Sequence, residues 1–167
     1  MENKKTPRIV FLDIDGVLNS EVDFNNYTEE EMQQYHDIAK RPLELLDEFI
    51  TETKALIVIS STWRKNKTVD ELRAIFKEKG FKNCDSIIAK TPVLGEGTVR
   101  GNEIKYWIEK NEEIINCKYY DFCSYVIFDD DSDMLLWQRE NYFRIDGYIG
   151  LTLNVLYRAK LFFERTK

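Results

Sequence analysis

The sequence predicts an α/β fold in which a three-layer, Rossmann-like parallel sheet carries helices on both faces. Short apolar runs that suit buried strands alternate with segments whose apolar residues recur at helical spacing. Strands covered on both faces read as near-continuous hydrophobic runs, as residues 9–12 and 55–59 do. Several of these runs lead into acidic or hydroxyl side chains. Because ligands bind beyond the carboxyl ends of parallel strands, the pattern also predicts a site at that edge of the sheet.

The first half of the chain is expected to hold two strands, an insert and a helix. The first strand covers residues 8–13. Residues 17–40 follow as an irregular, polar insert with a possible short helix near residues 28–37, and this insert is too short for a large cap domain. Pro42 suits the first turn of the next helix, where its missing N–H group costs nothing. The second strand covers residues 55–59 and leads into a Ser-Ser-Thr segment.

Cap and turn signals divide the second half of the chain. Thr68 and Glu71 have the spacing of a capping box, and Gly80 suits the end of the helix that they begin. The remaining elements are expected to be strands over residues 86–89, 125–128 and 142–145, a helix over residues 101–110, and a last helix that begins at Thr152.

Composition and charge favour one domain over residues 1–167. Hydrophobic residues make up 43% of the chain and charged residues 32%, as in ordinary globular proteins. The net charge of −6 disfavours sequence-independent nucleic-acid binding, although it leaves room for a locally basic groove. No run approaches the length of a membrane span, and three cysteines without metal-ligand spacing suit a reducing compartment. We expect a cytoplasmic protein with no membrane contact and no obligate protein partner.

The most informative residues are Asp13 and Asp15, at the end of the first strand. Residues two apart in a strand point to the same side, and two neighbouring carboxylates ionise cheaply only with a positive charge between them. The Asp-x-Asp-Gly sequence also suits a plain turn. A calcium-binding loop is excluded, because its sixth and twelfth positions need Gly and Glu, and here they hold Leu18 and Phe24. A divalent cation at the strand end is the favoured interpretation.

Two further strands are expected to end in oxygen-bearing side chains. Ser60 follows the second strand, and Asp129 and Asp130 follow the fourth, with Asp133 just beyond. Any one of these is compatible with an ordinary turn, but three such strand ends are not expected by chance. Oxygen-only ligands suit Mg²⁺, which is typically bound by one or two carboxylates and a substrate phosphate. The sequence therefore predicts a magnesium site.

These motifs resemble those of the haloacid dehalogenase-like (HAD) phosphohydrolase superfamily. Residues 11–18 match the first motif of that superfamily almost letter for letter, residues 57–60 are similar to the second motif, and residues 126–130 to the fourth. More narrowly, the chain resembles the branch described as HAD domains of Swiss Army Knife RNA repair proteins, in residues 59–64, 100–104 and 150–152. The resemblance implies a HAD-like fold with a minimal cap insert.

The resemblance also implies roles for four residues. Asp13 would be the nucleophile that forms an aspartyl-phosphate, and Asp15 would be the general acid and base. Ser60 would donate a hydrogen bond to a phosphoryl oxygen. The Asp13 carboxylate, the Asp15 backbone carbonyl and the Asp130 side chain would bind Mg²⁺, which screens the charge between nucleophile and phosphoryl group.

The third motif of the family needs a basic residue, and two residues qualify. Arg100 lies at the start of a predicted helix, where a basic side chain can join the backbone N–H groups around a phosphate. Lys105 lies one turn later and reads more simply as a solvated side chain, so we favour Arg100. Asp129 is a further candidate metal ligand, but orienting the basic residue is its favoured role. Asp133 is expected in the outer shell of the site.

Three residues are candidates for substrate contact. Ser61 and Arg64 follow the second motif, and Lys105 is the alternative basic residue. Trp63, between them in the sequence, suits either substrate contact or core packing.

The leading hypothesis is a Mg²⁺-dependent phosphomonoesterase that acts through an aspartyl-phosphate. Members of the family with little cap tend to accept large substrates, which favours a phosphate on a nucleotide or nucleic-acid end. The acidic net charge favours a small phosphometabolite instead. A non-catalytic phosphate-binding module is the alternative from another functional class.

Overall fold

Five parallel strands form one sheet in a computed structural model that describes residues 6–24, 37–115 and 124–166. The strand order is β3-β2-β1-β4-β5, so the chain turns back at β1, between β2 and β4. An open α/β sheet has its ligand crevice at such a switch point. The strands are β1 (Ile9–Leu12), β2 (Leu56–Ile59), β3 (Ile87–Lys90), β4 (Tyr125–Asp129) and β5 (Tyr142–Arg144).

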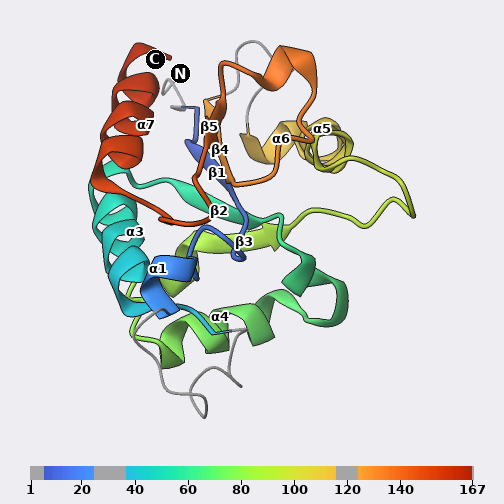
Figure 1. The fold of residues 1–167 in the computed structure, drawn as a ribbon. Coiled ribbons are helices and arrows are strands. Elements are labelled where there is room, and N and C mark those ends of the chain that lie inside the picture. Colours follow the sequence, from blue (N-terminus) through green and yellow to red (C-terminus); the bar gives the residue numbers. More distant parts are fainter. Residues whose placement is uncertain (1–5, 25–36, 116–123, 167) are drawn as a thin grey trace.

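Helices cover both faces of the sheet, which gives three layers (Figure 1). On one face lie α3 (Lys40–Thr53) and α7 (Leu153–Arg165), and α4 (Val69–Glu78) adds its buried side chains to the same core cluster. The other face is covered by α5 (Arg100–Lys110) and α6 (Glu112–Ile115). Shorter elements are α1 (Glu21–Phe24) and the 3₁₀ turns η1 (Thr62–Asn66), η2 (Cys84–Ser86) and η4 (Leu136–Gln138).

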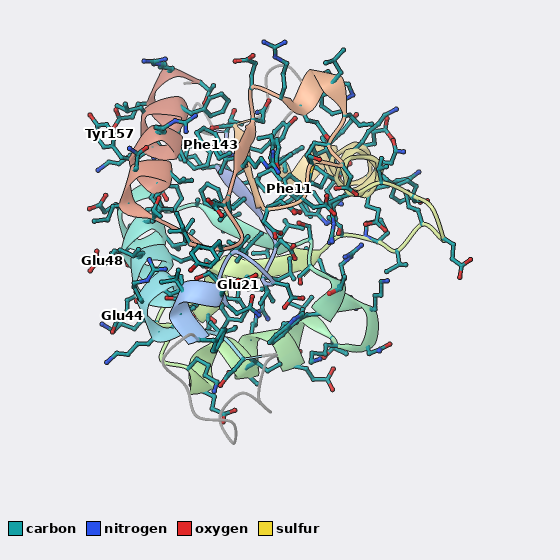
Figure 2. The ribbon with its side chains drawn as sticks, viewed as in Figure 1. Phe11, Glu21, Glu44, Glu48, Phe143 and Tyr157 are labelled. Carbon is teal, nitrogen blue, oxygen red and sulfur yellow. The ribbon has the colours of Figure 1, made fainter. Side chains whose placement is uncertain are left out.

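Aromatic side chains fill both interfaces between the layers. On the α3–α7 side, the ring of Phe49 lies 5.8 Å from that of Phe128 and 6.1 Å from that of Phe163. On the α5 side, Phe11 meets Trp107 edge to face at 5.5 Å. Figure 2 shows Phe11 and Phe143 inside the molecule, whereas Tyr157 lies on the outer surface of α7. The sheet is therefore held rigidly from both sides.

The strands and long helices lie where the sequence predicts them, within one or two residues. The capping box of Thr68 and Glu71 is present at the start of α4, and Thr152 accepts a hydrogen bond at the start of α7. The sequence did not predict α1, α6 or the 3₁₀ turns, because one-turn elements carry too few residues for a periodic pattern. Residues 25–36 of the predicted insert, and with them most of the possible helix near residues 28–37, lie outside the described residues.

The register of the central strands brings their carboxyl ends together. Leu12 of β1 pairs with Ile59 of β2 on one side and with Phe128 of β4 on the other. The next residue along each strand is therefore a neighbour: the Ser60 N–H group donates to the Leu12 carbonyl at 2.8 Å, and the Asp13 N–H group donates to the Phe128 carbonyl at 2.9 Å. The three predicted strand ends thus meet at one edge of the sheet.

A helix that spans a membrane must be long and predominantly apolar. Within the described parts of the chain, no helix combines the length and the hydrophobicity needed to cross a membrane.

Candidate active site

Asp13 occupies the centre of this edge and is almost completely buried, with 6% of its surface exposed. Its Oδ1 atom accepts a hydrogen bond of 2.8 Å from the Ile14 N–H group, and the Ser61 side chain donates a second bond to the carboxylate. Burial raises the pKa of Asp13 to about 6, and the positive charge of Arg100 opposes that rise. The carboxylate is therefore held firmly in an environment that disfavours its charge.

Asp129 and Asp130 join Asp13 in a carboxylate cluster. One oxygen from each of the three lies within 4.8 Å of the others. Burial and the neighbouring Asp13 raise the pKa of Asp129 to about 8, and burial also raises the pKa of Asp130. Arg100 supplies one positive charge, with its Nε atom 3.9 Å from Asp129 Oδ2, which is too long for a hydrogen bond. For all three carboxyl groups burial outweighs the attraction of the nearby guanidinium groups, Arg100 at Asp13 and Asp129 and Arg144 at Asp130.

Three buried polar atoms of the site have no hydrogen-bond partner among the described residues. They are the Ser60 hydroxyl, the Arg100 Nη1 atom and Asp129 Oδ2. A buried polar atom without a partner typically costs about 1–3 kcal/mol, so native proteins rarely leave several together. Donors at Ser60 and Arg100 suit an anionic oxygen, and the carboxylate oxygens suit a cation. The donor set therefore fits a divalent metal ion beside a phosphoryl group.

Two glycines make room for Asp130. Gly16 has a φ of 71°, and a Cβ atom on it would overlap the Asp130 carboxylate. A Cβ atom on Gly147 would lie 2.6 Å from Asp130 Oδ2. The carboxylate borders a pocket of about 450 Å³, lined by Asp15, Gly16, Asn19, Glu21, Asp130, Gly147 and Tyr148. Glycine at both positions allows this close approach of backbone to the site.

Asp15 lies at the rim of the cluster, and three side chains donate hydrogen bonds to its carboxylate. The Asn19 amide donates at 2.8 Å, and the Thr62 hydroxyl at 3.3 Å. The Trp63 indole N–H group lies within 3.0 and 3.1 Å of the two carboxylate oxygens. The Asp15 side chain is thus oriented by groups from two separate segments of the chain.

The two candidates for the basic residue occupy different surroundings. The side chain of Arg100 is 14% exposed and faces Asp129. Its backbone N–H group donates to Asp133 Oδ2 at 2.7 Å, so Asp133 holds the first turn of α5. Lys105 is 42% exposed and lies 3.8 Å from Glu109 on the surface of the same helix. The geometry therefore brings Arg100, and not Lys105, to the carboxylate cluster.

Arg64 is not placed for the substrate contact that the sequence predicts. Its side chain is 2% exposed, and its guanidinium pairs with the carboxylate of Glu103, on α5. Further hydrogen bonds go to the backbone carbonyls of Ser60, Ser61 and Thr91. The guanidinium has no free face toward a ligand, so its role is to tie the segment after β2 to α5. Glu103 was not predicted as the partner of Arg64, because no pattern in the sequence around either residue indicates the pair.

The predicted contact at Ser61 differs in detail, and two side chains that contact Asp15 were not predicted. Ser61 is fully buried and donates a hydrogen bond to the Asp13 carboxylate, so it orients that carboxylate instead of lining an open surface. The side chains of Asn19 and Thr62 were not predicted at all. Asn19, four residues after Asp15 and beyond Gly16, is the local signal that would have suggested a turn closed by its side chain. No local signal points to Thr62, which lies 47 residues from Asp15 in the sequence.

The fold and the site define an α/β domain with an aspartate cluster at the switch point of its sheet. The chain belongs to the family described as "HAD domain in Swiss Army Knife RNA repair proteins", whose model matches residues 9–156. Membership of this family points to phosphatase-type chemistry. Searches of curated proteins and of solved structures gave no match.

The Arg64–Glu103 pair generates a stability prediction. Arg64→Ala is expected to lower the free energy of unfolding by about 3–5 kcal/mol, because the Glu103 carboxylate would stay buried without its partner. Chemical denaturation measures this, with Lys65→Ala on the exposed side of the same turn as the matched control. A stable Arg64→Ala protein with only a raised KM would restore the substrate-contact hypothesis.

The buried carboxylates predict a pH dependence for the metal-free protein. A pKa raised by folding means that the folded state binds protons more tightly than the unfolded chain, so stability falls as pH rises from about 4 to about 8. We expect thermal unfolding in a chelator to show this fall, and Mg²⁺ to reduce it. Asp129→Asn should flatten the profile, whereas Asp70→Asn, at an 89% exposed side chain, should not. If the stability of the unmodified, metal-free protein does not change over this pH range, the raised pKa values of Asp13 and Asp129 are wrong.

Proposed function

We propose that this protein is a Mg²⁺-dependent phosphomonoesterase that acts through an aspartyl-phosphate on Asp13. The observation that carries the proposal is the set of buried, unpartnered polar atoms around that carboxylate: the Ser60 hydroxyl, Arg100 Nη1 and Asp129 Oδ2. They supply donors for a phosphoryl group and an acceptor for a cation within one buried cluster. A purely structural turn would have no need of either.

Asp13 is the group best placed to attack phosphorus. Its carboxylate is fixed by the Ile14 N–H group and the Ser61 side chain, so one oxygen can be aimed without loss of orientation during the reaction. Ser60 and Arg100 would bind phosphoryl oxygens and stabilise the charge that develops on them. Attack by Asp13 breaks the bond from phosphorus to the leaving oxygen and leaves the phosphoryl group on the aspartate.

Asp15 would move the protons. It would donate a proton to the leaving oxygen in the first step and accept one from water when the aspartyl-phosphate is hydrolysed. Its three donors, Asn19, Thr62 and Trp63, hold the carboxylate at the rim where a leaving group would lie.

The cluster of Asp13, Asp129 and Asp130 fits a hard divalent cation. Mg²⁺ bound by Asp13 and Asp130, with the Asp15 backbone carbonyl, would offset the repulsion between the nucleophile and an anionic phosphate. Asp129 would orient Arg100, which lies closest to it, and would complete the negative charge that attracts the ion.

The substrate we favour is a terminal phosphate on a nucleotide or nucleic acid. The family description refers to RNA repair proteins, and this supports a nucleic-acid end. The net charge of −6 favours a small phosphometabolite as the second candidate. A non-catalytic phosphate-binding module is the third, and turnover of a generic phosphate ester would exclude it.

The nucleophile is tested by Asp13→Asn, which keeps the shape of the side chain but removes the attacking oxygen. We expect no measurable turnover of p-nitrophenyl phosphate with Mg²⁺, and none by the unmodified protein in a chelator. Circular dichroism and thermal unfolding should show that the variant is folded. Robust turnover by the folded variant, or by the metal-free protein, would overturn the mechanism.

The basic residue is tested by a pair of variants on one helix. Arg100→Ala is expected to lower kcat by about 10²–10³-fold, the usual cost of one donor to the developing negative charge. Lys105→Ala should leave kcat nearly unchanged, because its ammonium lies by Glu109 on the surface. The opposite ranking of the two variants in steady-state assays would assign the role to Lys105.

A further inference from the structure

A second pocket adjoins the candidate site and shares only Asp15 with the pocket beside Asp130. Its volume is about 460 Å³, and it is lined by Asp15, Asp37, Thr62, Trp63, Lys67 and Ile75. A general acid must lie next to the oxygen that it protonates, so the leaving group of a substrate has to extend from Asp15. Among the described residues, these two pockets border Asp15 and give two directions in which the leaving group could extend.

Charge separates the two pockets. The first is lined by the carboxylates of Glu21 and Asp130 in addition to Asp15. In the second, Asp37 forms an ion pair of 2.6 Å with Lys79. Among the described residues no carboxylate lies within ion-pair distance of the Lys67 ammonium. Even with Mg²⁺ bound at Asp130, the first pocket is lined by the Glu21 carboxylate and, among the described residues, by no basic side chain, so a leaving group that itself carries negative charge would be favoured in the second pocket.

Trp63 forms a fixed aromatic wall in the second pocket. Its indole N–H group bonds the Asp15 carboxylate, and its ring packs partly against the hydrophobic core. The Lys67 ammonium lies over the ring, 5.6 Å from its centroid. An aromatic face with a cation beside it is the combination that proteins use to bind the bases and the backbone of single-stranded nucleic acid.

We propose that this pocket binds the leaving group of the substrate and that its preferred occupant is a nucleoside, with the base stacked on Trp63. Lys67 would then move to the rim of the ring, toward the phosphodiester charges of a longer strand. This inference rests on the proposed function, because it places the leaving group by the acid role of Asp15. In this proposal Trp63 has two roles that can be tested separately. Its ring contacts the base, and its N–H group positions Asp15.

A matched pair of substrates isolates the base. Adenosine 5′-monophosphate and ribose 5-phosphate have the same leaving oxygen and differ in the base. With Mg²⁺, kcat/KM should be higher for the nucleotide by roughly tenfold or more, as expected of one base stacked on an aromatic ring. A short oligonucleotide with a terminal phosphate, with and without its terminal base, provides the same comparison for a strand end.

Variants of Trp63 and Lys67 test the aromatic ring, the indole N–H group and the ammonium separately. Trp63→Leu should abolish the preference for the nucleotide. Trp63→Phe should keep most of the preference but lower kcat for both substrates alike, because only the N–H group to Asp15 is lost. With the oligonucleotide, Lys67→Ala should raise KM, whereas Lys65→Ala, at an exposed lysine two residues earlier, should not.

Binding is measured separately in the Asp13→Asn variant. Adenosine 5′-monophosphate should quench tryptophan fluorescence there, and Trp63→Phe in the same background should remove the quenching. If the unmodified protein hydrolyses adenosine 5′-monophosphate and ribose 5-phosphate at equal rates, and the nucleotide does not quench the fluorescence of the Asp13→Asn variant, the proposal for the pocket is overturned. The phosphatase proposal would stand. If the unmodified protein hydrolyses neither substrate but the quenching depends on Trp63, nucleotide binding in the pocket is supported and the phosphatase proposal is overturned. A preference that persists in Trp63→Leu would also overturn the pocket.

Discussion

The negative charge buried at the end of β1 is the constraint on which the rest of the site depends. Asp13 is 6% exposed and Asp129 is fully buried, and both lie beside Asp130, with Arg100 as the basic residue that acts on both of them. Removing an ion from water costs several kcal/mol, while a domain has a net stability of only about 5–15 kcal/mol. Such a cluster persists only because the surrounding fold holds it, and a cation bound there would offset the charge of its carboxylates.

The sheet meets this constraint by fixing two of the carboxylates at strand ends, Asp129 as the last residue of β4 and Asp13 directly after β1. β1 is central, with β2 and β4 paired on either side, and helices cover both of its faces. The Asp13 N–H group bonds the Phe128 carbonyl one residue before Asp129, so the two acids cannot separate without breaking the ladder. Sites built on strands hold their groups more precisely than sites built on flexible segments.

Much of this arrangement is predictable from sequence, because it follows from the chain's local pattern. Apolar runs that end in Asp13, Ser60 and Asp129 define three strand ends, and the rules of parallel sheets bring those ends to one edge. The parallel α/β fold was predictable because apolar strand-like runs alternate with helical patterns along the chain. The partners of Arg64 and Asp15 were not predictable, since a bond such as Arg64 to Glu103 joins residues 39 apart and depends on how α5 packs. Side-chain pairing at that range leaves no periodic signal.

The segment after β2 shows why a motif residue need not contact the substrate. Within it, Ser61 bonds Asp13, Thr62 and Trp63 bond Asp15, and Arg64 joins α5, the helix that begins at Arg100. Successive side chains of a 3₁₀ turn point in different directions, so one short turn can reach several groups at once. Substitutions along this segment would therefore reach Asp13, Asp15 and α5 through different side chains. The turn is therefore a common support for the site, and its sequence is constrained by the groups it holds in place.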